Sequence, residues 1–115
     1  MTQLLSTHTA FSDGIVKIAG RFRNVVVCAV RDHGLRLSRF EQQFTDRFYD
    51  FGFSDGVCVV GSAGMTVRGK TPFVCASAGT LTGRCYEFIR NSVCHPNVNV
   101  KFIGTQSGFS LSQDG

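Results

Sequence analysis

The chain has 115 residues, of which 43% are hydrophobic, and it carries a formal net charge of +4. This length supports one hydrophobic core and excludes a multidomain enzyme, so we expect a single domain over residues 1–115. No apolar run approaches the roughly 18 residues of a membrane helix, and the N-terminus lacks the basic and apolar parts of a secretion signal. We therefore expect a soluble, cytoplasmic protein without a membrane partner.

The twelve basic residues are scattered along the sequence, and only residues 31–39 form a cluster. A nucleic-acid surface usually needs a denser basic stripe with interleaved aromatic residues. We interpret the cluster as a solvated loop or a contact for an acidic partner, and we expect no nucleic-acid partner.

Five cysteines are spread along the chain among apolar residues and form no C-x-x-C pair; they are Cys28, Cys58, Cys75, Cys85 and Cys94. This pattern predicts buried, reduced thiols. Cys94 stands beside His95, but no second pair completes a metal site, so no metal ligand is predicted. His8 and His33 lie in polar stretches, and we expect both to be exposed.

The first half of the chain predicts a helix followed by a buried strand. Apolar residues recur every three or four positions over about residues 9–22, with Thr7 or Thr9 as the helix cap. Residues 25–30 are a continuous apolar run of mainly β-branched residues, which is typical of a central parallel strand covered on both faces. A polar loop is expected over residues 31–38, and one or two helical turns over residues 40–44.

The stretch from residue 47 to residue 65 predicts a short buried strand, a tight turn at Gly52 and a helix over about residues 54–68. Ser54 and Asp55 occupy the expected N-cap position, and such a cap is worth about 1 kcal/mol. In an open α/β sheet, ligands usually bind at the carboxyl ends of the strands. Asp55 is therefore a candidate both for the helix cap and for a ligand contact, and the two roles are compatible.

The second half continues the alternation of strands and helices. Residues 72–76 predict a strand, residues 77–82 a small-residue loop, residues 83–94 a helix and residues 98–104 a last strand. Residues 105–115 lack the composition to fold on their own. The order α, β, β, α, β, α, β predicts an α/β fold with a mostly parallel sheet flanked by helices. An unpaired strand at the edge of this sheet would favour self-association or a partner's strand.

Four short motifs occur in a fixed order: RFYDFGFSD at residues 47–55, GKTPFV at 69–74, LTGRCYEFIRNS at 81–92 and PNVNVK at 96–101. The first resembles the RF-x-x-x-GIAE segment of the pyrimidine-binding domain of the transketolase family. The other three, and residues 108–115, are similar to that domain in register. The resemblance covers nearly the whole chain.

The resemblance implies that this domain holds the aminopyrimidine ring of thiamine diphosphate at a dimer interface, while a partner domain binds Mg²⁺ and the diphosphate. Asp55 stands where the family has a glutamate that hydrogen-bonds a ring nitrogen and promotes formation of the reactive ylid, so it is implied as the catalytic residue. Ser77 and Thr80 stand at cofactor-binding positions where aromatic residues stack on the ring. A one-residue shift of the alignment would place Ala78 and Leu81 there instead.

The chain departs from the family pattern in four respects. Asp55 is one CH₂ shorter than glutamate, which retracts its carboxylate by roughly 1.5 Å, and a misplacement of about 1 Å can lower a rate on the order of 100-fold. No aromatic residue stands at the stacking positions in either alignment, which removes on the order of 1 kcal/mol of stacking free energy from cofactor binding. The sequence stops at residue 115, where the family continues with a Thr-His-Gln segment, and it has Val30-Arg31-Asp32 where the family has Asp-Leu.

Three functions are compatible with this sequence. The first is a pyrimidine-binding module that contributes to ketol transfer between sugar phosphates, in a homodimer or in a hetero-complex with a diphosphate-binding subunit. The second is a degenerate, non-catalytic interaction module that has lost the cofactor. The third is an unrelated flavodoxin-like module with a phosphate at the turn over residues 30–34, which contains only one glycine.

Overall fold

The structure is a computed structural model that describes residues 3–110, the side chain of Asp32 excepted. Four parallel strands form one sheet in the order β2-β1-β3-β4. The strands are β1 (Val25–Ala29), β2 (Phe48–Asp50), β3 (Thr71–Ser77) and β4 (Lys101–Thr105). The helices are α1 (Thr7–Arg21), α2 (Ser38–Gln43), α3 (Asp55–Thr66), α4 (Ala78–Thr82) and α5 (Tyr86–Ile89). The predicted α/β fold with a parallel sheet flanked by helices is confirmed.

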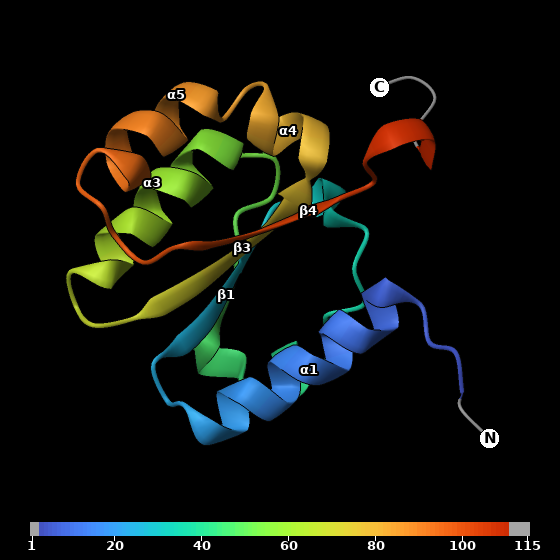
Figure 1. The fold of residues 1–115 in the computed structure, drawn as a ribbon. Helices are drawn as coiled ribbons and strands as arrows, with labels where there is room; N and C mark the ends of the chain where they lie inside the picture. Colours follow the sequence, from blue (N-terminus) through green and yellow to red (C-terminus); the bar gives the residue numbers. More distant parts are fainter. Residues whose placement is uncertain (1–2, 111–115) are drawn as a thin grey trace.

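Strand β1 is buried on both faces because helices cover both sides of the sheet. Val25, Val27 and Ala29 belong to the same apolar cluster as residues of α1 and α2. Val26 and Cys28 face the other way and share a cluster with Cys58 of α3. Figure 1 shows α1 on one side of the sheet, and α3, α4 and α5 on the other. Since side chains alternate along a strand, only a continuous apolar run can fill both layers, and the predicted central strand is confirmed.

Helix α1 begins at Thr7, before the predicted start at about residue 9. Ser6 is its N-cap, and the Ser6 Oγ accepts a hydrogen bond from the Thr9 amide at 3.2 Å, so the expected cap at Thr7 or Thr9 is wrong. At the other end, the Arg47 guanidinium donates to the carbonyls of Ala19 and Phe22, at 3.0 and 3.1 Å. These bonds satisfy carbonyls at the end of α1, which the helix itself leaves unpaired.

Strand β2 exists where it was predicted, but it is not a buried strand. Phe48 is half-buried, while Tyr49 and Asp50 are exposed. The reason is its position in the sheet, since β2 is one of the two edge strands and pairs with β1 alone over three residues. An edge strand this short presents few unpaired backbone groups.

The connection from β3 to β4 differs most from the prediction. The expected loop over residues 77–82 is helix α4, because the Ser77 Oγ accepts a hydrogen bond from the Thr80 amide at 3.3 Å and caps a helical turn. The expected helix over residues 83–94 is divided into the short α5 and a π-helical turn, Arg90–Cys94. The last strand begins at Lys101 rather than at residue 98.

The expected unstructured tail is partly ordered. Thr105 ends β4, and Gly108–Ser110 form a 3₁₀ turn. Residues 111–115 lie outside the described part of the chain. Within residues 3–110, no helix is long and apolar enough to span a membrane.

None of the five cysteines, all within residues 3–110, forms a disulfide, and four of them are buried: Cys28, Cys58, Cys75 and Cys85. Cys94 is exposed, so the prediction of buried thiols is wrong for this residue, which ends the π-helical turn on the outside of the molecule. Burial raises the pKa of the Cys28 thiol, an effect partly offset by a hydrogen bond to Ser62. Burial also raises the pKa of Cys75 to about 12. Such thiols stay protonated and chemically inert at neutral pH.

We expect the free energy of unfolding to fall as the pH rises above about 9. The ordinary thiol pKa is 9.0, whereas the pKa of folded Cys75 is about 12, so between these values only the unfolded chain loses this proton. The stabilisation is therefore complete below pH 9 and falls by about 1.4 kcal/mol per pH unit between pH 9 and 12. Urea unfolding at a series of pH values measures this slope. The slope should become shallower in Cys75→Ala and stay the same in Cys94→Ser; equal slopes in all three proteins would contradict the assignment.

Candidate functional site

The carboxyl ends of the four strands meet at one edge of the sheet because all strands are parallel. Hydrogen bonds tie the loops at this edge together. The Arg31 amide donates to the Gly52 carbonyl at 2.8 Å, which joins the segments after β1 and β2. The Thr105 hydroxyl at the end of β4 donates to the His33 carbonyl at 2.5 Å. The chain passes from β1 to β2 toward one side of the sheet and from β3 to β4 toward the other. Open α/β sheets usually hold ligands at the carboxyl ends of strands where the connections diverge in this way.

Asp55 is the first residue of α3 and lies just beyond this edge. Ser54 takes the N-cap position, but its side chain makes no capping bond. The Asp55 Oδ1 instead accepts a hydrogen bond from the neighbouring Gly56 amide at 2.7 Å. The predicted N-cap role of Asp55 is therefore wrong in position, although a carboxylate in the first turn still favours the helix through its dipole.

The second Asp55 oxygen forms an ion pair with Arg84. Oδ2 is buried, and only 17% of the Asp55 side chain is exposed, whereas 68% of the Arg84 side chain is exposed. Arg90 likewise forms an ion pair, with Glu87 at 3.4 Å. The acidic group at the start of α3 thus has a cationic partner from a segment about 30 residues away.

A glycine places Arg84 opposite Asp55. A Cβ on Gly83 would lie 2.8 Å from the Gly79 carbonyl oxygen, so only glycine allows the chain to pass this close to α4. After this turn, Cys85 is fully buried, and its amide donates to the Thr80 carbonyl at 3.0 Å. The backbone on both sides of Arg84 is therefore fixed.

An apolar pocket of about 600 Å³ lies beside Asp55. Its wall is formed by Val57, Val60 and Gly61 of α3 and by Phe88 of α5. Phe88 lies so close to α3 that a Cβ on Gly56 would be 2.7 Å from the ring. The pocket thus combines one carboxylate with an aromatic and aliphatic surface.

Ser77 and Thr80 do not line this pocket. Both are buried, and the Ser77 hydroxyl donates to the Thr80 hydroxyl at 2.9 Å. In the alternative alignment, Ala78 is half-buried and Leu81 is buried in the core beside β1 and β3. The structure brings Ser77 and Thr80 together as the first turn of α4, and it does not bring them to Asp55.

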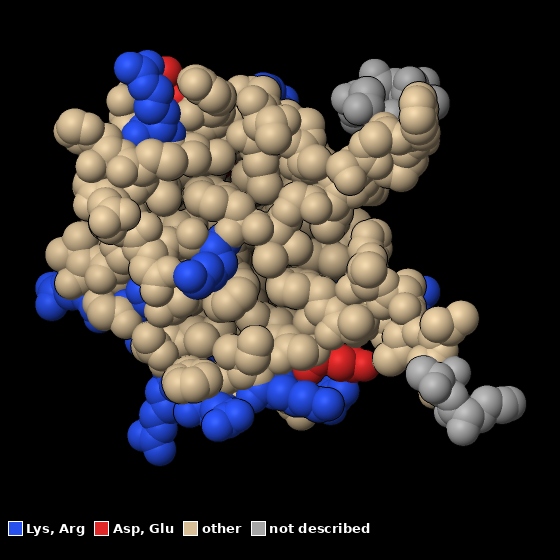
Figure 2. Space-filling view, viewed as in Figure 1, with Lys and Arg blue, Asp and Glu red and all other residues tan. Residues whose placement is uncertain are grey.

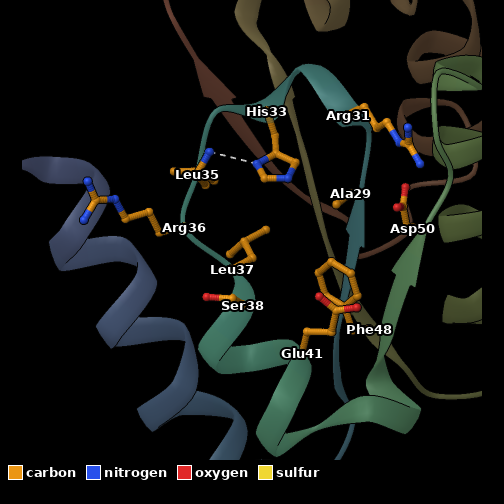
Figure 3. Close-up of a pocket in the computed structure, with 10 residues that line it drawn as sticks. All are labelled: Ala29, Arg31, His33, Leu35, Arg36, Leu37, Ser38, Glu41, Phe48 and Asp50. Carbon is orange, nitrogen blue, oxygen red and sulfur yellow. Dashed lines mark hydrogen bonds between the residues drawn. The ribbon is translucent and has the colours of Figure 1, made fainter.

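A second pocket, of about 450 Å³, lies between the ends of β1 and β2 and was not predicted from the sequence (Figure 3). Its polar lining consists of Arg31, His33, Arg36, Ser38, Glu41 and Asp50. His33 is half-buried, and its Nδ1 accepts a hydrogen bond from the Leu35 amide at 2.8 Å, so the prediction that His33 is exposed is wrong. The polar run directly after the buried strand β1 was the available signal for this pocket.

Among residues 3–110, no group of three or more His, Cys, Asp or Glu side chains is placed to hold a metal ion.

No family model matches the chain. It is similar, however, to solved and curated proteins that are named as transketolases or as 1-deoxy-D-xylulose-5-phosphate synthases. A solved structure described as a split gene transketolase, inactive beta4 tetramer, superposes with a TM-score of 0.77 at 28% identity over 89% of this chain. A Methanocaldococcus jannaschii protein named as a transketolase C-terminal section is 27% identical over 106 residues, 91% of this chain. A 1-deoxy-D-xylulose-5-phosphate synthase of Methylacidiphilum infernorum is 34% identical over 101 residues, 87% of this chain.

The chain is a transketolase-like domain. The resemblance stated from the sequence motifs is thereby confirmed. This transketolase-like domain spans 34% of the Methanocaldococcus protein and of the solved chain, and 16% of the synthase. It therefore corresponds to one part of each of these proteins.

We expect Gly83→Ala to destabilise the transketolase-like domain by about 1–3 kcal/mol, because the added methyl group meets a backbone carbonyl that cannot move alone. Gly64→Ala is the matched control, since a Cβ at this exposed position of α3 meets nothing within 4 Å. That variant should gain up to about 1 kcal/mol from helix propensity. Thermal unfolding of both variants measures the difference, and equal midpoints would show that the close approach at Gly83 is not required.

Proposed function

We propose that the transketolase-like domain folds as one unit over residues 1–115 and binds the aminopyrimidine ring of thiamine diphosphate. In this proposal it contributes to ketol (glycolaldehyde) transfer between sugar phosphates, together with a partner chain that carries the diphosphate-binding domain and its Mg²⁺. The observation that carries the proposal is the Asp55 carboxylate, held at the start of α3 beside an apolar pocket. Asp55 is the catalytic residue of this proposal.

The residues of this pocket suit an aminopyrimidine ring. The ring is flat and apolar on its faces, which matches the surface of Val57, Val60 and Phe88. Its edge carries nitrogen atoms, and Asp55 can accept a hydrogen bond from a protonated ring nitrogen and hold that proton. When bound, thiamine diphosphate supplies a carbon nucleophile that takes up the ketol group. The role of the protein is to bind the ring and orient its edge toward Asp55.

The second pocket supports a phosphate-bearing substrate at the same edge of the sheet. Arg31, Arg36 and His33 offer N–H donors, and guanidinium groups bind phosphate oxygens in a bidentate manner. Glu41 and Asp50 add acceptors for hydroxyl groups. We assign the sugar phosphate to this pocket in the assembled complex.

A partner chain would complete the site. Large apolar side chains around Asp55 are exposed, including Phe53 at 73%, Val57 at 62% and Val60 at 44%. Exposed apolar surface of this kind marks protein interfaces. The names of two similar proteins, a C-terminal section and a split gene transketolase, support a division of the enzyme between chains.

A second candidate is a non-catalytic interaction module. Asp55 is shorter than glutamate, Ser77 and Thr80 bond each other rather than lining the pocket, and Arg84 occupies one Asp55 oxygen. These features favour loss of cofactor binding with retention of the fold and of the exposed α3 surface. Titration of the chain with thiamine diphosphate and Mg²⁺ distinguishes the two candidates.

We expect thiamine diphosphate with Mg²⁺ to release heat when titrated into this chain mixed with a diphosphate-binding transketolase chain. Asp55→Ala should abolish this heat, because it removes the only carboxylate of the pocket among the described residues. Asp46→Ala, at an exposed position before β2, should bind as the native chain does. If the folded protein gives no heat alone or in the mixture, the cofactor proposal fails and the interaction module remains.

We expect Val57→Asp to weaken association of the chain, with itself or with the diphosphate-binding chain, by at least about tenfold, because it places a charge on the apolar surface beside Asp55. Val67→Asp is the control at the far end of α3, where the side chain is 81% exposed. Light scattering of each protein alone and in the mixture measures association. A native chain that stays monomeric at micromolar concentration in both experiments would contradict the proposed interface.

A further inference from the structure

Arg84 forms an ion pair with Oδ2 of Asp55, the oxygen that would bind the ligand in the proposed function. We infer that Arg84 is a positioning residue whose guanidinium blocks access to the Asp55 Oδ2 in the chain without ligand. A flat ligand with N–H donors on its edge then binds only by displacing this guanidinium. This inference rests on the proposed function, because the ligand it concerns is the aminopyrimidine ring. It adds a competition between a side chain and the ligand for one carboxylate oxygen.

Both oxygens of Asp55 are engaged. Oδ1 accepts from the Gly56 amide within the first turn of α3, and this bond persists as long as the helix begins there. Oδ2 is buried and pairs with Arg84. A ligand in the adjoining pocket therefore reaches Oδ2 only after the guanidinium has moved.

The guanidinium of Arg84 can move, whereas the Arg84 backbone is held in place. Its side chain is 68% exposed, so the guanidinium can swing into solvent without leaving a cavity. Its backbone is held by the close passage of Gly83 past Gly79 and by the fully buried Cys85. The released guanidinium thus remains near the pocket and returns when the ligand leaves.

The chemistry of the guanidinium matches that of the proposed ligand. A guanidinium is planar and presents N–H donors in a fixed geometry to a carboxylate. An aminopyrimidine that is protonated on its ring also presents coplanar N–H donors from one edge. The Arg84 guanidinium therefore competes with the ligand's donors for Oδ2 through its ion pair, and the pocket wall of Val57, Val60 and Phe88 is left for the ring.

The closed state can be measured without a ligand. A water-soluble carbodiimide with an amine modifies accessible carboxylates, and mass spectrometry gives the rate at Asp55. We expect Arg84→Gln to raise this rate about fivefold, in keeping with the modest strength of an ion pair whose cation is exposed. Arg90→Gln is the matched control, because Arg90 is 65% exposed and pairs with Glu87 instead. Equal rates at Asp55 in both variants would overturn the inference.

The binding experiment uses 4-amino-2-methylpyrimidine as the probe, with the Gly56 amide as the NMR reporter in the native chain and its variants. We expect Arg84→Gln to bind the probe about fivefold more tightly, Arg84→Lys to lie between that variant and the native chain, and Arg90→Gln to be unchanged. Asp55→Asn should lose binding. Each spectrum also shows whether the variant is folded.

The outcomes separate the two proposals. Binding that is lost in Asp55→Asn but is equal in the native chain and Arg84→Gln leaves the proposed function intact and overturns the role of Arg84. Weaker binding in Arg84→Gln also overturns it, since Arg84 would then assist the ligand rather than compete with it. Absence of binding in every folded variant overturns the proposed function, and the competition fails with it.

Discussion

The burial of β1 on both faces is the constraint on which the rest of the structure depends. Its alternating side chains supply one apolar layer to α1 and α2 and another to α3, so the two helix layers can form only with this strand between them. A strand covered on both sides pairs with parallel neighbours through helical crossovers. From this arrangement it follows that all four carboxyl ends, with the loops that carry the polar residues, meet at one edge (Figure 1).

At that edge the two sides of the sheet have different chemistry. The pocket between the ends of β1 and β2 is lined by charged and hydrogen-bonding groups, whereas the pocket along α3 is apolar except for Asp55 and its neighbour Ser54. Figure 2 shows basic side chains gathered along the lower border of the molecule, on the side of α1, and a surface over β4 that is uncharged apart from a basic side chain near its centre. The same edge thus offers a polar surface and a separate apolar surface.

The sequence alone predicted those features that depend on neighbouring residues. The strand β1, the helix α1 and the turn at Gly52 follow from apolar periodicity and from the φ of +59° that glycine permits. It failed where the outcome depends on position in the fold. Phe48–Asp50 resembles a buried strand but lies at the edge of the sheet, and the residues after Ser77 resemble a loop but are capped into a helix. His33 was expected to be exposed to solvent, but it is half-buried, and its carbonyl accepts a hydrogen bond from Thr105 at the end of β4.

For the candidate site, the sequence by itself determined that an acidic residue begins α3 after a parallel strand, and that the motifs are those of the transketolase family. Only the tertiary structure decided which groups surround Asp55. The pairing with Arg84, the separation of Ser77 and Thr80 from the pocket, and the pocket between β1 and β2 all join segments that are distant along the chain. Side-chain periodicity carries no information on such pairings, because they are set by how the crossovers fold each segment back onto the edge of the sheet.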